Sequence, residues 1–231
     1  MSKKLVGIVP SAKLFKNDDP YADRYEFVNS YIKRIEENGG VALGVLAHDG
    51  RLDTESLAVF DSFLITGGLQ IHPYHFQVVE YCWRHRKKLL GICLGMQVIH
   101  SFFTVLEESK KRGFDGELLD LYIQMKREKH MFVLPVEGHW QHNITRNNIE
   151  PTRHEVSLLQ DSHISRILQT ESLRGSSMHN YAIHCPQGDL KLTGTSLDGS
   201  PEAVEYDDHI LGVQFHPEVD GSLDKLFQFL L

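Results

Sequence analysis

The chain has 231 residues, a formal net charge of −7 at pH 7, and hydrophobic and charged fractions of 41% and 24%. These fractions are those of a globular protein and exclude a wholly disordered chain or a collagen-like fibre. The negative charge argues against generic binding of nucleic acid or of an anionic membrane, and the sequence has no apolar run of about 18 residues that would span a bilayer.

The cysteines and the N-terminal residues indicate in which cellular compartment the protein resides. Cys82, Cys93 and Cys185 are widely spaced and include no C-x-x-C pair, so they do not indicate a disulfide framework. The apolar run after Lys4 ends at Pro10 and is too short for the apolar region of a secretory signal. We therefore expect a cytoplasmic protein with reduced cysteines.

The first half of the chain alternates strand-like and helix-like segments. Short apolar runs predict a buried strand at residues 5–9 and further strands at residues 41–46, 63–66 and 89–92. Apolar residues spaced by three and four predict helices between them: one after Asp19-Pro20 that stops at Asn38, one opened by Pro73, and one beginning near Met96. This rhythm predicts an α/β fold with a mainly parallel sheet, helices on both faces, and an active site at the carboxyl ends of the strands.

The second half of the chain has a different pattern. Residues 107–130 are rich in charges of both signs. We interpret this stretch as a surface excursion or lid with a solvent-facing helix, and a helix that docks a partner is the alternative. After Phe132 the pattern favours strands and turns, which predicts extra antiparallel strands. Because no repeat or Pro-rich linker divides the sequence, we expect residues 1–231 to form a single domain.

The segment Gly91-Ile92-Cys93-Leu94-Gly95 follows a predicted strand and opens a predicted helix. It corresponds to the G-x-S-x-G elbow that presents the nucleophile of many hydrolases. The two glycines lack the Cβ atoms that would clash at such a turn, and the start of a helix favours the thiolate form of Cys93. The Leu94 N–H would be free to donate to an oxyanion. The alternative is a buried structural cysteine.

A second polar strand end, His216-Pro217-Glu218, lies near the end of the sequence. A thiol enzyme needs an imidazole that takes up a proton and returns it to the leaving amine, and the imidazole needs an acceptor that fixes its tautomer. Alternate residues of an extended chain point the same way, so His216 and Glu218 can lie side by side. A lone histidine at a strand end is usually structural, but in combination with the elbow we predict a Cys93-His216-Glu218 triad.

Segments 91–97 and 212–218 together resemble the class I glutamine amidotransferases. This resemblance implies a flavodoxin-like α/β fold and cleavage of a γ-glutamyl amide through a thioester. Within the superfamily the chain is most similar to the γ-glutamyl-γ-aminobutyrate hydrolase branch of polyamine (putrescine) catabolism. That similarity is carried by residues 4–10, 64–68, 153–156, 177–183 and 198–205. The chain departs from the branch at Leu69, where aspartate is usual, and at Leu94, where arginine is common.

The resemblance also implies which residues bind the substrate. The backbone N–H groups of Gly68 and Leu94 are expected to hold the oxyanion, although the double glycine could simply end a strand. Gln97, His179, Asn180 and Tyr181 are expected to approach the glutamyl group. Gln97 could equally have only a packing role. The other three residues could instead stabilise a turn.

Two histidine pairs, His72 with His75 and His139 with His142, have a spacing that metal sites also use. Neither pair has a cysteine or glutamate nearby in a recognised ligand pattern. We therefore predict no metal, and the proposed chemistry requires no organic cofactor.

The leading hypothesis is a free-standing hydrolase that releases glutamate and an amine from a small-molecule γ-glutamyl amide. The alternative is a glutaminase subunit that supplies ammonia to a separate synthase partner. A binding module with an inactive site and a protease built on the same elbow are further alternatives. A homodimer is expected only because twofold assemblies are common.

Overall fold

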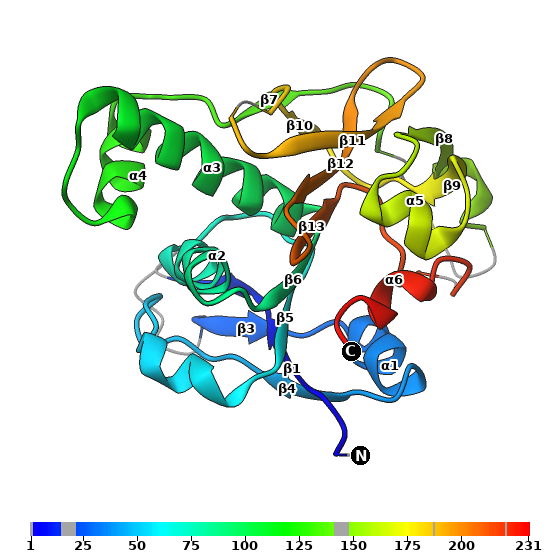
Figure 1. Ribbon diagram of the computed structural model, residues 1–231, viewed down its shortest axis with the longest axis horizontal. Helices are drawn as coiled ribbons and strands as arrows, with labels where there is room; N and C mark the ends of the chain where they lie inside the picture. Colours follow the sequence, from blue (N-terminus) through cyan, green and yellow to red (C-terminus); the bar gives the residue numbers. More distant parts are fainter. Residues whose placement is uncertain (1, 15–21, 141–147, 187, 220) are drawn as a thin grey trace.

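The computed structural model describes residues 2–14, 22–140, 148–186, 188–219 and 221–231, and it has a nine-stranded sheet at its centre (Figure 1). In spatial order, the strands of this sheet are β4 (Val41–Gly44), β1 (Leu5–Val9), β5 (Ser62–Ile65), β6 (Lys88–Ile92), β13 (Ile210–Val213), β12 (Pro201–Tyr206), β11 (Lys191–Ser196), β8 (Arg153–Leu158) and β9 (Ser172–Ser176). The helices are α1 (Asn29–Glu37), α2 (Pro73–His85), α3 (Leu94–Arg112), α4 (Leu118–Arg127), α5 (His163–Leu168) and α6 (Lys225–Gln228), with short 3-10 helices at Thr54–Val59 and Glu150–Thr152.

Two small antiparallel sheets complete the described structure. One joins β2 (Ser11–Lys13) to β3 (Arg24–Glu26), and the other joins β7 (Val133–Pro135) to β10 (Tyr181–Ile183). Within the described ranges, no helix has both the length and the apolar character needed to cross a membrane.

The central sheet has a parallel half and an antiparallel half. Strands β4, β1, β5, β6 and β13 pair in parallel, and in their own chain order they follow the 2-1-3-4-5 arrangement of flavodoxin-like sheets. Strands β12, β11, β8 and β9 continue the sheet with antiparallel pairing. The predicted flavodoxin-like fold, with extra antiparallel strands in the second half of the chain, is confirmed.

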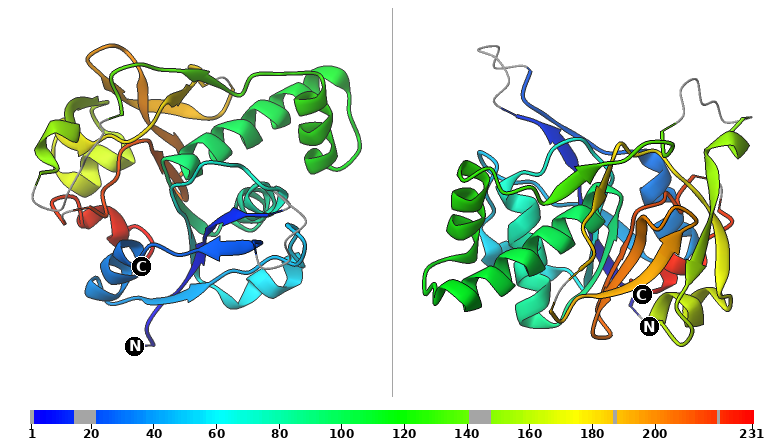
Figure 2. Two further views of the ribbon diagram at one scale, coloured as in Figure 1. Left: turned by 180° about the vertical axis from the view of Figure 1, so that it is seen from behind. Right: turned by 90° about the horizontal axis from the view of Figure 1, so that it is seen from above.

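Helices cover both faces of the parallel half, which gives the molecule two apolar cores (Figures 1 and 2). Side chains alternate across each strand, so on β5 Phe63 and Ile65 pack into the core with α2, α3 and α4, whereas Leu64 packs into the core with α1 and α6. Both faces of β5 and β6 are therefore buried, which explains their continuous apolar runs. Their carboxyl ends are the part left for polar chemistry.

The first helix begins later than the sequence indicates. Helix α1 starts at Asn29, because residues 24–26 form β3 and Val28 is the extended N-cap residue. Phe27 and Val28 are exposed instead of lying on the buried helix face. The Asp19-Pro20 signal lies outside the described residues.

The charged stretch 107–130 is the end of α3 followed by α4. The two helices pack on each other, and α4 also contacts α2. The apolar residues of α4, among them Leu121 and Tyr122, are buried in the core instead of facing solvent as predicted. Cys93 is the N-cap of α3, and this helix has 19 residues and rises about 28 Å. Its hairpin with α4 therefore projects from the end of α3 remote from the elbow, and Figure 1 shows the two helices side by side there.

Candidate active site

Cys93 lies where β6 ends and α3 begins, and it is 6% exposed. Its backbone angles of φ 54° and ψ −104° are rare for a residue with a side chain, and such strain costs on the order of 1–3 kcal/mol. Its N–H donates to Val213 O at 2.8 Å, and its carbonyl accepts from the Gln97 N–H at 3.2 Å. The strand-turn-helix elbow predicted from the glycine pattern is therefore present.

The glycines of the elbow are required by the close approach of three backbone segments. A Cβ atom on Gly91 would lie 2.6 Å from the carbonyl carbon of Gly95, and one on Gly95 would lie 2.5 Å from the carbonyl oxygen of Ile65 in β5. Backbone atoms of a paired strand cannot move aside as a flexible side chain can. Only glycine allows the elbow to sit so close to β5.

Three strand ends converge beside Gly67, which follows β5. A Cβ atom on Gly67 would lie 2.9 Å from Cε1 of His216 and 3.6 Å from Cβ of Cys93. The carboxyl ends of β5, β6 and β13 thus bring together the double glycine, the thiol and the imidazole. This is the edge of the sheet at which a parallel α/β fold places its active site.

The His216 ring is held by the residue predicted to orient it. Its Nδ1 atom lies 2.7 Å from Glu218 Oε1, and because a carboxylate only accepts, Nδ1 is the donor. The His216 backbone N–H donates to Ser176 O at 2.8 Å. Burial alone would lower the pKa of His216, but the charges of Glu218 and Cys93 raise that pKa well above its ordinary value. The arrangement favours an imidazolium next to the thiol.

Tyr31 belongs to this site, although the sequence indicates only a buried position on a helix. Its hydroxyl accepts from the Gly67 N–H at 3.1 Å. Burial, and then the charge of Glu218, raises the pKa of Tyr31 well above its ordinary value, so the hydroxyl stays protonated. Tyr31 therefore fixes the end of β5 beside Cys93 and His216. The one available signal was a hydroxyl on an otherwise apolar helix face.

The two predicted oxyanion donors lie next to each other. Leu94 is the first residue of α3, so its N–H has no acceptor within the helix. A Cβ atom on Gly68 would lie 2.9 Å from Cδ2 of Leu94, which places the two residues in contact. Gly67 has its N–H occupied by Tyr31, which leaves Gly68 as the donor from this strand end. Their role in catalysis stays a prediction.

The carboxylate of Glu218 gives rise to a pH-dependent prediction. Because Glu218 helps to raise the pKa of His216, a Glu218→Gln variant is expected to have a lower imidazole pKa. The alkaline limb of the kcat/KM profile for amide hydrolysis should then move to lower pH, and the rate should fall on the order of 10²- to 10⁴-fold. The measurement is a pH–rate profile, with the exposed Glu36→Gln as the matched control. An unmoved alkaline limb would show that Glu218 does not act on His216.

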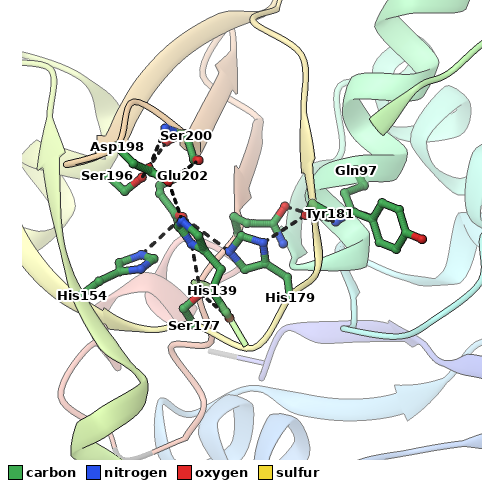
Figure 3. A network of polar contacts seen from close by, with 11 residues as sticks. Gln97, His139, His154, Ser177, His179, Tyr181, Ser196, Asp198, Ser200 and Glu202 are labelled. Carbon is green, nitrogen blue, oxygen red and sulfur yellow. Dashed lines mark hydrogen bonds and ion pairs between the residues drawn. The ribbon is translucent and has the colours of Figure 1, made fainter. Parts of the chain in front are cut away.

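The predicted substrate-binding residues form a second network beside the elbow. The Gln97 side-chain Nε2 donates to Tyr181 O at 3.1 Å and to Gln214 Oε1 at 3.3 Å, and His179 Nδ1 donates to the same Tyr181 carbonyl at 3.0 Å (Figure 3). Gln97 and His179 are buried, whereas Asn180 and Tyr181 are exposed. These contacts join α3 to the 177–181 segment, and binding of the glutamyl group by these residues stays a prediction.

The two histidine pairs differ in their surroundings. His72 and His75 form the capping box of α2, in which the His72 N–H donates to His75 Nδ1 at 3.0 Å and His75 Nε2 contacts Pro10 O at 3.0 Å. Burial lowers the pKa of His75 to about 3, so this ring is neutral. His142 lies outside the described residues. His139 is buried in a cluster with residues distant in the sequence.

The comparison with protein families agrees with the fold. The sequence model described as glutamine amidotransferase class-I matches residues 22–230. Among solved structures, the chain is similar to the glutaminase domain of a Trypanosoma brucei CTP synthase with bound acivicin, at a TM-score of 0.64 and 16% identity, with 99% of this chain and 92% of that chain covered.

Curated relatives include both long and short proteins. The CTP synthase of Methanothermobacter thermautotrophicus is 29% identical over 210 residues, which cover 85% of this chain but only 38% of that protein. A glutamine amidotransferase-like protein of Rickettsia prowazekii is 24% identical, with 99% of this chain and 97% of that protein covered. The chain therefore spans well under half of the first relative and nearly all of the second.

Proposed function

Because the chain belongs to the class I glutamine amidotransferase family, we propose that it hydrolyses the side-chain amide of glutamine to glutamate and ammonia with Cys93 as the nucleophile. The observation that carries this proposal is the convergence of Cys93 and the His216–Glu218 pair at neighbouring strand ends. The similarity to CTP synthases favours glutamine as the substrate over a larger γ-glutamyl amide.

In the proposed reaction, the Cys93 thiolate attacks the amide carbonyl and a tetrahedral adduct forms. The N–H groups of Gly68 and Leu94 stabilise its oxyanion, and one such donor typically lowers the barrier by about 2.7–4 kcal/mol. His216 protonates the departing nitrogen, so ammonia leaves and a glutamyl thioester remains. His216 then removes a proton from water, which attacks the thioester and releases glutamate and the thiol. Glu218 holds the imidazole in one tautomer throughout.

The fate of the ammonia is part of the proposal. A relative named CTP synthase contains a further region, because the match covers only 38% of its length. We infer that ammonia from this chain is likewise used by a synthase unit, as a separate subunit or as part of a longer assembly. In that arrangement hydrolysis by the isolated chain is slow, and it rises when the synthase is present.

A second candidate is the hydrolysis of larger γ-glutamyl amides, such as γ-glutamyl-γ-aminobutyrate. One observation favours it: the Rickettsia relative is matched over 97% of its length, which leaves no room in that protein for a synthase region. A chain that acts alone has no synthase to use the ammonia. Such a chain can release a larger amine as readily as it releases ammonia.

The test is release of glutamate from glutamine, γ-glutamyl-γ-aminobutyrate and γ-glutamyl-putrescine, with kcat/KM measured for each. We expect glutamine to be preferred by at least about 10-fold, since a pocket shaped for an ammonia leaving group excludes a larger amine. A preference for either γ-glutamyl amine would reject the glutaminase proposal in favour of the second candidate. Failure of all three substrates, in the presence of ATP and a cell extract as the source of a synthase, would reject both.

A further inference from the structure

A cluster of two buried histidines and one half-buried histidine around a buried glutamate lies outside the proposed reaction. His139 follows β7, His154 lies on β8, His179 lies between β9 and β10, and Glu202 lies on β12. The exposed fraction is 5% for His139, 4% for His179 and 0% for Glu202. Figure 3 shows the three imidazoles pointing toward the carboxylate. Four segments that are distant in the sequence thus direct polar atoms at one buried point.

The distances within this cluster are too long for good hydrogen bonds. From Glu202 Oε1, the distances are 3.5 Å to His139 Nδ1, 3.5 Å to His179 Nε2 and 3.3 Å to His154 Nε2. N–H···O bonds in proteins typically measure about 2.7–3.2 Å. Among the described residues, neither carboxylate oxygen of Glu202 accepts a hydrogen bond, and His179 Nε2 also lacks a hydrogen-bond partner. A fully buried carboxylate without such partners is costly.

The outer contacts of two rings fix their tautomers. His139 Nε2 lies 3.0 Å from Asp198 Oδ2, and His179 Nδ1 lies 3.0 Å from Tyr181 O. Both oxygens only accept, so these two nitrogens carry protons. In the neutral rings, His139 Nδ1 and His179 Nε2 then present lone pairs. The lone pair of His179 Nε2 faces Glu202 Oε1 at 3.5 Å, and that of His139 Nδ1 lies between Glu202 Oε1 at 3.5 Å and the Ser177 hydroxyl oxygen at 3.4 Å. Three electron-rich atoms around one point call for a cation between them.

We propose that His139 Nδ1, His179 Nε2 and the Glu202 carboxylate bind a divalent transition-metal ion, with zinc as the expected occupant. The three ligand atoms all lie within 4.8 Å of one another. Ligands placed about 2.0–2.1 Å from a tetrahedral zinc ion are separated by about 3.3 Å, which is close to the 3.5 Å from Glu202 Oε1 to each of the two imidazole nitrogens. Two imidazoles and one carboxylate are donors that zinc accepts readily.

The surroundings of the cluster match those of known metal sites. A histidine ligand usually donates its other ring N–H to a carboxylate or a backbone carbonyl, as His139 and His179 do here. Asp198 is itself fixed, because Ser196 Oγ donates to its Oδ1 at 2.5 Å and Ser200 Oγ to its Oδ2 at 3.1 Å. His154 Nε2 lies 3.3 Å from the same Glu202 oxygen without a hydrogen bond to it, at the edge of the cluster.

The site has a structural role distinct from the chemistry at Cys93. The ion would join β12 to the 177–181 segment, whose Tyr181 carbonyl is held by Gln97 of α3. The Glu202 carbonyl in turn accepts from the Gln214 N–H, two residues before His216. Metal binding would therefore link the 177–181 segment, which lies beside the elbow, to the segment that leads to His216.

The test measures zinc binding to the full chain in a Cys93→Ala background, which removes the active-site thiol as a ligand. Equilibrium dialysis against zinc chloride with elemental analysis should give one equivalent of tightly bound zinc. Cobalt(II) in its place should show visible d–d absorption without a thiolate charge-transfer band. His139→Asn and Glu202→Gln should each weaken zinc binding by at least about 100-fold, and Asp198→Asn by about 10- to 100-fold.

The exposed His48, which lies beside Asp49, provides the matched control, and His48→Asn should leave zinc binding unchanged. Circular dichroism establishes that each variant is folded. If Glu202→Gln fails to fold, the zinc affinities of His139→Asn and Asp198→Asn test the proposal in its place. Zinc should also raise the Tm of the parent chain but not that of His139→Asn. Absence of stoichiometric zinc binding in the parent, or binding unchanged in the folded His139 and Asp198 variants, would overturn the proposal.

Discussion

Cys93→Ala is expected to abolish glutamate release from glutamine, with a loss on the order of 10⁴- to 10⁶-fold. The side chain of Cys93 supplies the atom that forms the thioester, and neither water nor His216 can replace it. The fold should persist, because alanine keeps the Cβ atom of Cys93 and removes a single sulfur atom. The measurement is a coupled assay of glutamate release by purified protein.

The control for that variant is Cys185→Ala, since Cys185 is a free cysteine that is exposed and lies outside the elbow. It should keep full activity. A second readout is labelling by a γ-glutamyl electrophile, which should modify the parent and the Cys185 variant but not the Cys93 variant. If Cys93→Ala retained more than about 1% of the parental rate, the thioester mechanism would be wrong.

The second large effect is expected from Gly95→Ala. The added Cβ would lie 2.5 Å from the carbonyl oxygen of Ile65, which belongs to a strand paired on both sides. The strand cannot yield, so α3 must move away from β5. We expect a loss of at least about 2 kcal/mol in the free energy of unfolding, or a fall in Tm of about 4–8 °C. Displacement of the elbow by about 1 Å should lower the rate on the order of 100-fold as well.

Urea unfolding followed by tryptophan fluorescence measures this loss of stability, and the glutamate assay measures the loss of rate. Gly116→Ala is the matched control, because its Cβ would meet only the ring of Phe114, a partly exposed side chain that can turn away. It should change stability by less than about 0.5 kcal/mol. A Gly95→Ala protein with parental stability and rate would mean that the elbow is not held against β5 as described.

The parts of the fold and site that depend on local pattern could be predicted from the sequence. Buried strands of a parallel sheet are apolar throughout, so β1, β5 and β6 stand out. The elbow could be predicted because Gly91 and Gly95 answer a steric demand within one short segment. The contact between His216 and Glu218, two residues apart, could also be predicted, but not its cause: β13 ends at Val213, and Glu218 reaches the ring from a turn and not from an extended strand.

The features that depend on long-range pairing could not be predicted. Nothing local indicates that Tyr31 of α1 reaches Gly67, or that Glu202 lies between His139 and His179. The spacing of His139 and His142 suggested a ligand pair, but the residues that surround His139 come from other strands. The buried face of α4 was hidden by the many charges around it, because a pattern rich in charge conceals a short apolar stripe.

The position of β13 has a consequence for the order of events during synthesis. This strand pairs with β6, and its Val213 carbonyl holds the Cys93 N–H, yet it is made long after the elbow has left the ribosome. Until β13 docks, the Cys93 N–H lacks its Val213 acceptor and no imidazole stands beside the thiol. Because such non-local pairing forms slowly, the nascent chain carries a dormant cysteine. We therefore expect the thiol to become reactive only once β13 has paired with β6, late in the folding of the sheet.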